Sequence, residues 1–279
     1  MNFVSLFFLL IFLHFFKGLF FKSFNLKEVW NIGLIILLFL IIESFLGYVL
    51  IWSQMSFWAC TVITSLVIVI PFLGVKLVFW IWRNFFISSL TLKLFFLVHF
   101  ILPLLILILI VFHLFFLHFY LRTRKSNFYI KIEKIIFFPF YWLKDIYNLI
   151  IIFLFFIWIF FLPLYFNDCE IFLESNYLSS PIHIVPEWYF LFAYDILRSI
   201  KNKLFGVFIL IIRIIIFFIF NLKKKTFNFK LNNIFNYIFF FNLIFIRWLG
   251  ACLVELPFIV IRIIFSIFYF FILFFIFYF

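Results

Sequence analysis

The chain has 279 residues, of which 70% are hydrophobic and 28% aromatic, while only 11% carry a charge. A soluble domain is nearer half apolar and a quarter charged, so this sequence lacks the polar surface to cover a globule. The net charge is +12, but no base-stacking or groove-reading motif accompanies it, which argues against a nucleic-acid partner. We therefore predict an integral membrane protein.

Long apolar stretches give the predicted elements, because a helix needs about 20 apolar residues to cross a bilayer. The stretch 55–86 is apolar but interrupted by Pro71 and Gly74, which predicts interfacial helices instead of a span. The stretch 167–203 holds several acids and two prolines and predicts an extramembrane loop with a short amphipathic helix. The sequence thus indicates an all-α, polytopic transmembrane helical bundle of about seven spans. The predicted spans are 3–20, 29–51, 94–118, 147–166, 204–220, 235–254 and 258–278.

Basic residues predict the orientation of the spans. Most of them fall in the loops within 17–27, 122–144 and 223–230, while the opposite loops hold fewer bases and most of the acids. The positive-inside rule places the first set on the matrix or cytoplasmic side. Residues 1–13 have no charged region of the kind that opens a secretory signal, so we expect none.

Three histidines lie in the apolar segment HFILPLLILILIVFHLFFLH, residues 99–118, where an ionisable group is costly unless something binds it. His99 and His113 are 14 residues apart, which places them on nearly the same helix face and about 21 Å apart along the axis. This spacing suits two stacked haems, each with a second ligand from another helix, and His14 could supply one. Bis-histidine ligation leaves no open coordination site, so such irons would carry electrons. Hydrogen bonding between helices is the alternative role for these histidines.

Two glycines in the following span repeat the histidine spacing. Gly33 and Gly47 are also 14 residues apart. A glycine lets a bulky group approach the backbone, although ordinary contact between helices is its more frequent use in a membrane. The coincidence with the histidine spacing favours a porphyrin packed against these glycines.

Six further segments carry specific motifs: WNIG (30–33), GYVLIWSQMSFWACTVIT (47–64), FFLVHFILP (95–103), VFHLFFLH (111–118), PEWYFLFAYDILRSIKNKL (186–204) and WLGACLVELPF (248–258). These segments resemble mitochondrial cytochrome b, the haem-carrying and quinone-binding subunit of ubiquinol–cytochrome c reductase (complex III). The resemblance covers nearly the whole chain, and PEWY together with two spaced histidines is a highly specific combination. It implies a haem-binding region over 1–120, truncated at its start, and a C-terminal region over 121–279 with the quinol-site PEWY loop.

The resemblance assigns the haem ligands. It implies that His14 and His113 ligate a high-potential haem on the matrix side, and that His99 ligates a low-potential haem on the other side. The two glycines would pack against these haems. The family's fourth ligand, the partner of His99, would fall one residue upstream of Met1, and the family's first span would lie upstream as well.

The resemblance also implies two quinone sites. The outer, quinol-oxidising site would use Glu187, Tyr189 and Tyr194, beside a wall around Trp58 and Ala59. A carboxylate at the edge of a membrane pocket can accept a proton from quinol, although an acid just after a proline is also typical of a helix start. The inner, quinone-reducing site would use His118, Ser126, Lys144 and Asp145.

The function implied by the resemblance is that of a catalytic subunit of quinol–cytochrome c oxidoreductase in the mitochondrial inner membrane. Two non-covalent b-type haems would carry electrons from ubiquinol to ubiquinone, coupled to proton translocation. The implied partners are a Rieske-type iron–sulfur subunit, a cytochrome c1-type subunit and the lipid bilayer, in a homodimeric complex. The alternatives are an incomplete cytochrome b fragment and a membrane transporter with a histidine proton relay.

One departure from the family pattern affects a turn within the matching segment 47–64. The family reads Pro-Trp-Gly-Gln there, whereas this chain has Ile51, Trp52, Ser53 and Gln54. The loss of the proline and the glycine leaves the geometry of that turn open.

Overall fold

The computed structural model describes residues 2–120, 135–165, 168–220 and 229–278. Within these ranges the regular elements are helices, apart from one isolated bridge between Ser53 and Glu174. The prediction of an all-α bundle is confirmed, and each of the seven predicted spans is a helix. These are α1 (Asn2–Phe20), α2 (Lys27–Leu50), α5 (Ser89–Tyr120), α6 (Trp142–Phe161), α8 (Lys203–Ile219), α9 (Phe229–Ala251) and α10 (Phe258–Tyr278).

Among the described residues, six of these helices are long and apolar enough to cross a membrane, all except α8. Helix α8 has 17 residues, which at 1.5 Å per residue gives about 26 Å, slightly less than the hydrocarbon core. Large apolar side chains such as Phe96, Phe100 and Leu104 on α5 are exposed. Such a surface is suited to lipid because the helix satisfies its backbone hydrogen bonds internally.

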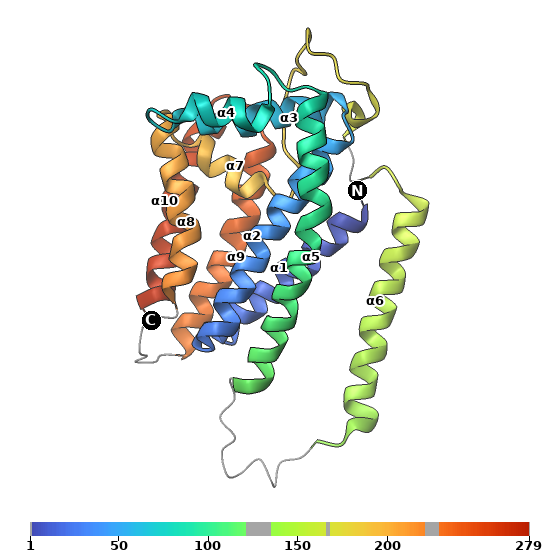
Figure 1. Cartoon of the computed structure of the whole chain (residues 1–279). Helices are drawn as coiled ribbons and strands as arrows, with labels where there is room; N and C mark the ends of the chain where they lie inside the picture. The colour runs from blue at the N-terminus through green and yellow to red at the C-terminus, as the bar shows by residue number, and fades with distance from the viewer. Residues whose placement is uncertain (1, 121–134, 166–167, 221–228, 279) are drawn as a thin grey trace.

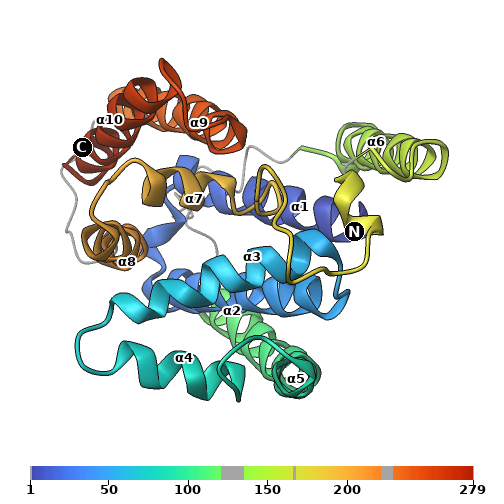
Figure 2. The same ribbon diagram turned by 90° about the horizontal axis from the view of Figure 1, so that it is seen from above.

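The short helices lie across one end of the bundle (Figure 1). Helices α3 (Gln54–Ser65) and α4 (Gly74–Trp82) have 12 and 9 residues and run crosswise over the spans, as predicted for 55–86. The predicted extramembrane loop contains a 3-10 turn at Cys169–Phe172 and helix α7 (Leu191–Arg198). Figure 2, seen from above, shows α7 between α1 and the α9–α10 pair, while α6 stands apart from the other helices.

The turn between α2 and α3 forms without the family's proline and glycine. Trp52 adopts a left-handed conformation with φ of 56°. Ser53 then caps α3, because its Oγ accepts a hydrogen bond from the Ser56 backbone N at 3.3 Å and its own N donates to Ser56 Oγ at 2.9 Å. The Gln54 backbone N donates to the Leu173 carbonyl at 2.9 Å. The capping box therefore stabilises the start of α3 in the absence of the proline and the glycine. The bond from Gln54 to Leu173 attaches the turn to the long loop.

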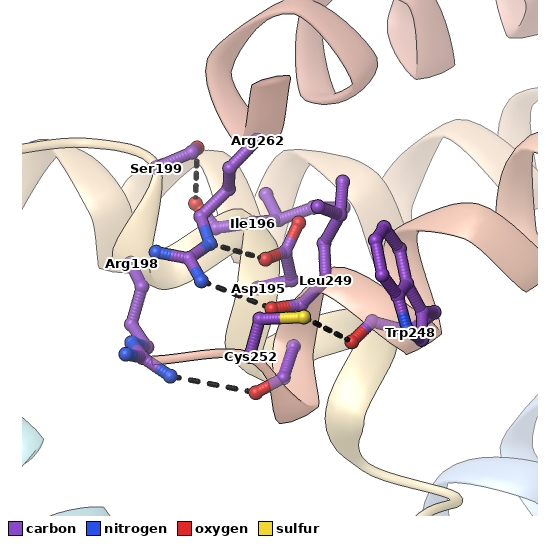
Figure 3. Close-up of polar contacts among 9 residues, drawn as sticks. Asp195, Ile196, Arg198, Ser199, Trp248, Leu249, Cys252 and Arg262 are labelled. Atoms are coloured by element: carbon purple, nitrogen blue, oxygen red, sulfur yellow. Dashed lines mark hydrogen bonds and ion pairs between the residues drawn. The ribbon is translucent and has the colours of Figure 1, made fainter. Parts of the chain in front are cut away.

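A buried ion pair joins α7 to the last two spans (Figure 3). Arg262 of α10 donates from Nε to Asp195 Oδ1 at 2.5 Å and from an outer nitrogen to the Leu249 carbonyl of α9 at 2.9 Å. The two charged side chains are 1% and 0% exposed. A Cβ on Gly250 would lie 2.5 Å from the Leu191 carbonyl, so only glycine allows α9 to approach α7 this closely. Helix α7 is thus held in place from two sides.

Replacing Asp195 with alanine is expected to destabilise the protein by about 3–5 kcal/mol, because it leaves the Arg262 charge buried without a partner. Thermal unfolding of the detergent-extracted protein measures this loss. The control is Ser199→Ala at the C-cap of the same helix, whose hydroxyl donates to the Ile196 carbonyl. The double variant Asp195→Ala/Arg262→Leu is expected to recover most of the stability. Equal melting of Asp195→Ala and the control would show that the pair contributes nothing.

Candidate functional site

The first candidate site is a cavity between α1, α2 and α5 where two histidines face each other. His14 of α1 and His113 of α5 have ring centroids 6.4 Å apart, with their planes at 68°. Both line a cavity of about 530 Å³, together with Trp30 and Gly33 of α2. The Nδ1 atom of His113 is buried and has no hydrogen-bond partner among the described residues.

This geometry fits the two axial ligands of one metal. Metal–imidazole bonds are ~2 Å long and a ring centroid lies roughly 1 Å behind its nitrogen, so two rings on opposite sides of a metal have centroids about 6 Å apart. A Cβ on Gly33 would lie 3.1 Å from His113 Cε1, so the absence of a side chain at Gly33 allows the His113 ring to pack against α2. No cluster of three or more His, Cys, Asp or Glu that could hold a bare metal ion occurs in the described ranges. The arrangement therefore suits a planar cofactor with two histidine ligands, such as haem.

The second candidate site surrounds His99, on the same helix α5. Its Nδ1 lies 2.7 Å from Oε1 of Glu43 and 3.2 Å from the Glu43 carbonyl oxygen, both on α2. A Cβ on Gly47 would meet His99 Cε1 at 2.8 Å, so α2 lies directly against the imidazole. Glu43 was not among the predicted site residues, although an acid in the interior of an apolar span is a signal that could have identified it.

The second ligand for a haem at His99 is not among the residues that the structure describes. The structure therefore shows the surroundings of one candidate ligand at this site, and a second ligand for a haem there stays a prediction.

A cavity of about 300 Å³ connects the His99 site with the predicted outer quinol site. Its lining includes Glu43, Tyr48 and His99 from the spans, and Glu187 and Tyr189 from the PEWY segment. These side chains come from distant parts of the sequence. The cavity therefore brings a candidate haem ligand and a candidate proton acceptor to one pocket.

Glu187 lies outside the spans, and its environment favours the protonated form. Burial raises the pKa of this carboxyl to about 7, and the negative charge of Asp168 adds to the shift. Burial also raises the pKa of the neighbouring Tyr189 phenol, with a contribution from Glu187. The Tyr189 ring stacks on Phe8 of α1 with centroids 4.3 Å apart. The pocket thus holds a carboxyl that can exchange a proton near neutral pH.

Tyr194 and the predicted wall residues Trp58 and Ala59 are not among the residues that line this cavity. The Tyr194 hydroxyl donates to the Ile184 carbonyl at 3.3 Å. Trp58 donates from Nε1 to the Ser179 carbonyl at 3.1 Å, which attaches α3 to the loop. Ala59 is buried in the same cluster as Tyr48. These contacts fix the loop that carries Glu187.

Two further contacts anchor the PEWY segment. Trp188 donates from Nε1 to Ser5 Oγ of α1 at 3.0 Å, and the Arg247 guanidinium of α9 lies 4.4 Å from the centroid of its ring. Another span arginine, Arg213, donates from Nε to the Tyr269 hydroxyl at 2.8 Å. These pairings fix the positions of two arginines within the spans.

The residues predicted for the inner quinone site are not gathered into one pocket in the described structure. His118 lies in the last turn of α5, and Lys144 and Asp145 lie in the first turn of α6; all three are exposed. Figures 1 and 2 show these two helices well separated. Ser126 lies outside the described residues. The inner site stays a prediction.

The fold and the two histidine sites are typical of a membrane-embedded haem protein. The family model "Cytochrome b/b6/petB" matches residues 1–121, and the model "Cytochrome b(C-terminal)/b6/petD" matches residues 174–270. The chain therefore belongs to the cytochrome b family, as its sequence motifs predicted, and the cytochrome b interpretation is favoured over the transporter hypothesis.

Curated relatives and a solved structure agree with this assignment. A cytochrome b from Caenorhabditis briggsae and one from Caenorhabditis elegans are each 46% identical over 271 residues, which is 96% of this chain and 73% of each relative. A cytochrome b from Apis mellifera ligustica is 44% identical over 276 residues, covering 97% of this chain and 72% of the relative. A chain from a structure described as "Hyperthermophilic respiratory Complex III" has the same fold, with a TM-score of 0.85 and 24% identity. That match covers 98% of this chain and 75% of the other.

Substituting either glycine with valine is expected to remove one haem signal, because the added side chain would occupy the space beside a histidine ring. We expect Gly33→Val to affect only the His14–His113 site and Gly47→Val only the His99 site. Reduced-minus-oxidised absorbance spectra of the purified complex measure each haem. The two variants serve as controls for each other, and full retention of both haems in both variants would contradict the assignment.

Proposed function

We propose that this chain is the quinol-oxidising cytochrome b subunit of a ubiquinol–cytochrome c reductase in the mitochondrial inner membrane. The observation that carries the proposal is the cavity shared by His99, Glu187 and Tyr189, because it places a proton acceptor beside a candidate electron acceptor. His14 and His113 would hold one b-type haem, and His99 would be a ligand of the other. These haems supply reversible one-electron transfer when bound.

The residues of the shared cavity suit the separation of protons from electrons. Oxidation of a quinol releases two electrons and two protons, and Glu187 with a pKa of about 7 can take a proton from the bound quinol hydroxyl. One electron would pass to an iron–sulfur partner and the other toward the His99 site. Phe8 and Tyr189 form an apolar wall that keeps water from the reacting ring.

Further parts of the proposal concern the assembly. The partners would be a Rieske-type iron–sulfur subunit and a cytochrome c1-type subunit, in a homodimeric complex. Support comes from the fold shared with a chain of a respiratory complex III and from the six apolar helices. Quinone reduction would occur at the opposite end of α5, near His118, Lys144 and Asp145, where basic residues indicate the matrix side.

The test of this function is the haem content and activity of the native complex. We expect two b-type haems with different midpoint potentials, and quinol–cytochrome c reductase activity. His14→Leu is expected to remove the high-potential haem and His99→Leu the low-potential haem, each with loss of turnover. An isolated complex without b-type absorbance, or one that keeps full turnover in both variants, would exclude this function.

The pH dependence of quinol oxidation follows from Glu187. Its pKa is raised from 4.5 to about 7, so the carboxyl is protonated below pH 7 and can accept a proton only above it. We expect the turnover rate to rise with pH through about 7, and Glu187→Gln to lower it roughly 10²-fold or more while removing this inflexion.

The matched control for that experiment is Asp168→Asn, which removes a negative charge that helps to raise the pKa of Glu187. We expect the inflexion in this variant to move to lower pH while turnover persists. An unchanged pH profile in Glu187→Gln would contradict the role of Glu187 as the proton acceptor.

A further inference from the structure

Glu43 is an acid inside an apolar span, a position that is costly unless the side chain is bound. It lies in α2, four residues before Gly47, and is largely buried. Its Oε1 atom is 2.7 Å from Nδ1 of His99, and its backbone oxygen is 3.2 Å from the same nitrogen. The contact with His99 therefore accounts for a carboxylate at this depth.

We propose that Glu43 is a positioning residue for His99, whose imidazole it orients and whose haem it shifts to lower reduction potential. The inference rests on the proposed function, since it assumes that His99 is an axial haem ligand. Glu43 acts through the imidazole, because its oxygen contacts the ring nitrogen opposite the one that would bind the iron.

The hydrogen-bond geometry determines the tautomer of His99. The carboxylate and the carbonyl oxygen that face Nδ1 are both acceptors, so this nitrogen must carry the proton and donate it. Nε2 is then unprotonated and free to bind a metal. A carboxylate at the outer nitrogen also fixes the orientation of a ligating histidine and increases its basicity.

The charge of Glu43 affects the two oxidation states of the iron unequally. A negative charge near the metal stabilises the ferric form more than the ferrous form, and the interaction is strong where water is excluded. A more basic imidazole acts in the same direction. Both effects lower the reduction potential of the haem that His99 holds.

The other candidate haem site has no equivalent acid. Nδ1 of His113 is buried and has no hydrogen-bond partner in the described part of the chain. The cavity between His14 and His113 is lined by apolar residues and by Lys17, whose charge is positive. A carboxylate thus contacts the histidine at one site, whereas a lysine lines the cavity at the other. This difference in charge predicts that a haem at His99 would have the lower potential.

The second carboxylate oxygen of Glu43 suggests a competing role. Oε2 is buried and has no hydrogen-bond partner in the described structure, and Glu43 lines the same cavity as Glu187. A carboxylate there could accept a proton from quinol directly. We favour the role at His99 because Oε1 is already engaged by the imidazole, and the test below separates the two roles.

The test is a redox titration of both haems in the isolated complex, by optical and electron paramagnetic resonance spectroscopy. Glu43→Gln keeps an acceptor for Nδ1 and removes the charge. We expect the low-potential midpoint to shift upward, with altered g values for that haem, while the high-potential haem stays unchanged as an internal control. Glu43→Asp keeps the charge on a shorter side chain, and we expect a smaller shift in the same direction.

Ser65→Ala is the matched control, because Ser65 does not line this cavity and donates its hydroxyl to the Val62 carbonyl. Its midpoints should equal those of the wild type. If Glu43→Gln does not assemble, the titration of Glu43→Asp against this control decides the question.

The outcomes distinguish this inference from the proposed function. Two haems with unchanged midpoints in Glu43→Gln and Glu43→Asp would overturn the role of Glu43 and leave the function intact. Slower quinol oxidation at unchanged potential would assign Glu43 to the quinol instead and would also overturn it. A wild-type complex without a low-potential haem would refute the proposed function itself.

Discussion

Hydrocarbon offers no hydrogen bonds, so an ionisable side chain in the bundle needs a partner from the protein. Arg262 is bound by Asp195, Arg213 by the Tyr269 hydroxyl, and His99 by Glu43. The exposed apolar side chains, by contrast, face lipid and need no specific partner. An ionisable group in a span of this protein therefore points to either a structural pairing or a site. The opposed histidines of α1 and α5 form a candidate site, because they line a cavity.

The structural pairings serve to position the site. The ion pair between Asp195 and Arg262 and the close approach at Gly250 fix α7 against α9 and α10. Helix α7 begins directly after the PEWY turn, so its position determines where Glu187 and Tyr189 meet the bundle. The long loop is held separately by the capped turn at Ser53. The pocket beside His99 is thus built from elements that are each anchored elsewhere.

The sequence predicted the spans and the histidine spacing because both depend on local pattern. Length and apolar composition determine a membrane helix, and 14 residues place His99 and His113 on one face. The pairings between side chains could not be predicted because their partners are distant in the sequence. Arg262 lies 67 residues from Asp195, and Glu43 lies 56 residues from His99. No local pattern specifies which helix faces which. The family motifs identified Glu187 as a candidate site residue, but they did not identify Glu43, which lies outside the matching segments.

The two carboxylates of the shared cavity occupy different environments, and this difference separates their roles. Glu43 is engaged by an imidazole through one oxygen, so its charge acts on the electron acceptor. Glu187 lies in the loop, and burial gives it a pKa of about 7, so it can gain and lose a proton at the pH of the cell. Quinol oxidation requires that the electron and the proton leave in different directions. In the proposed function, a cavity with one acid bound to the candidate haem ligand and one acid free to titrate would let the electron and the proton leave by different groups.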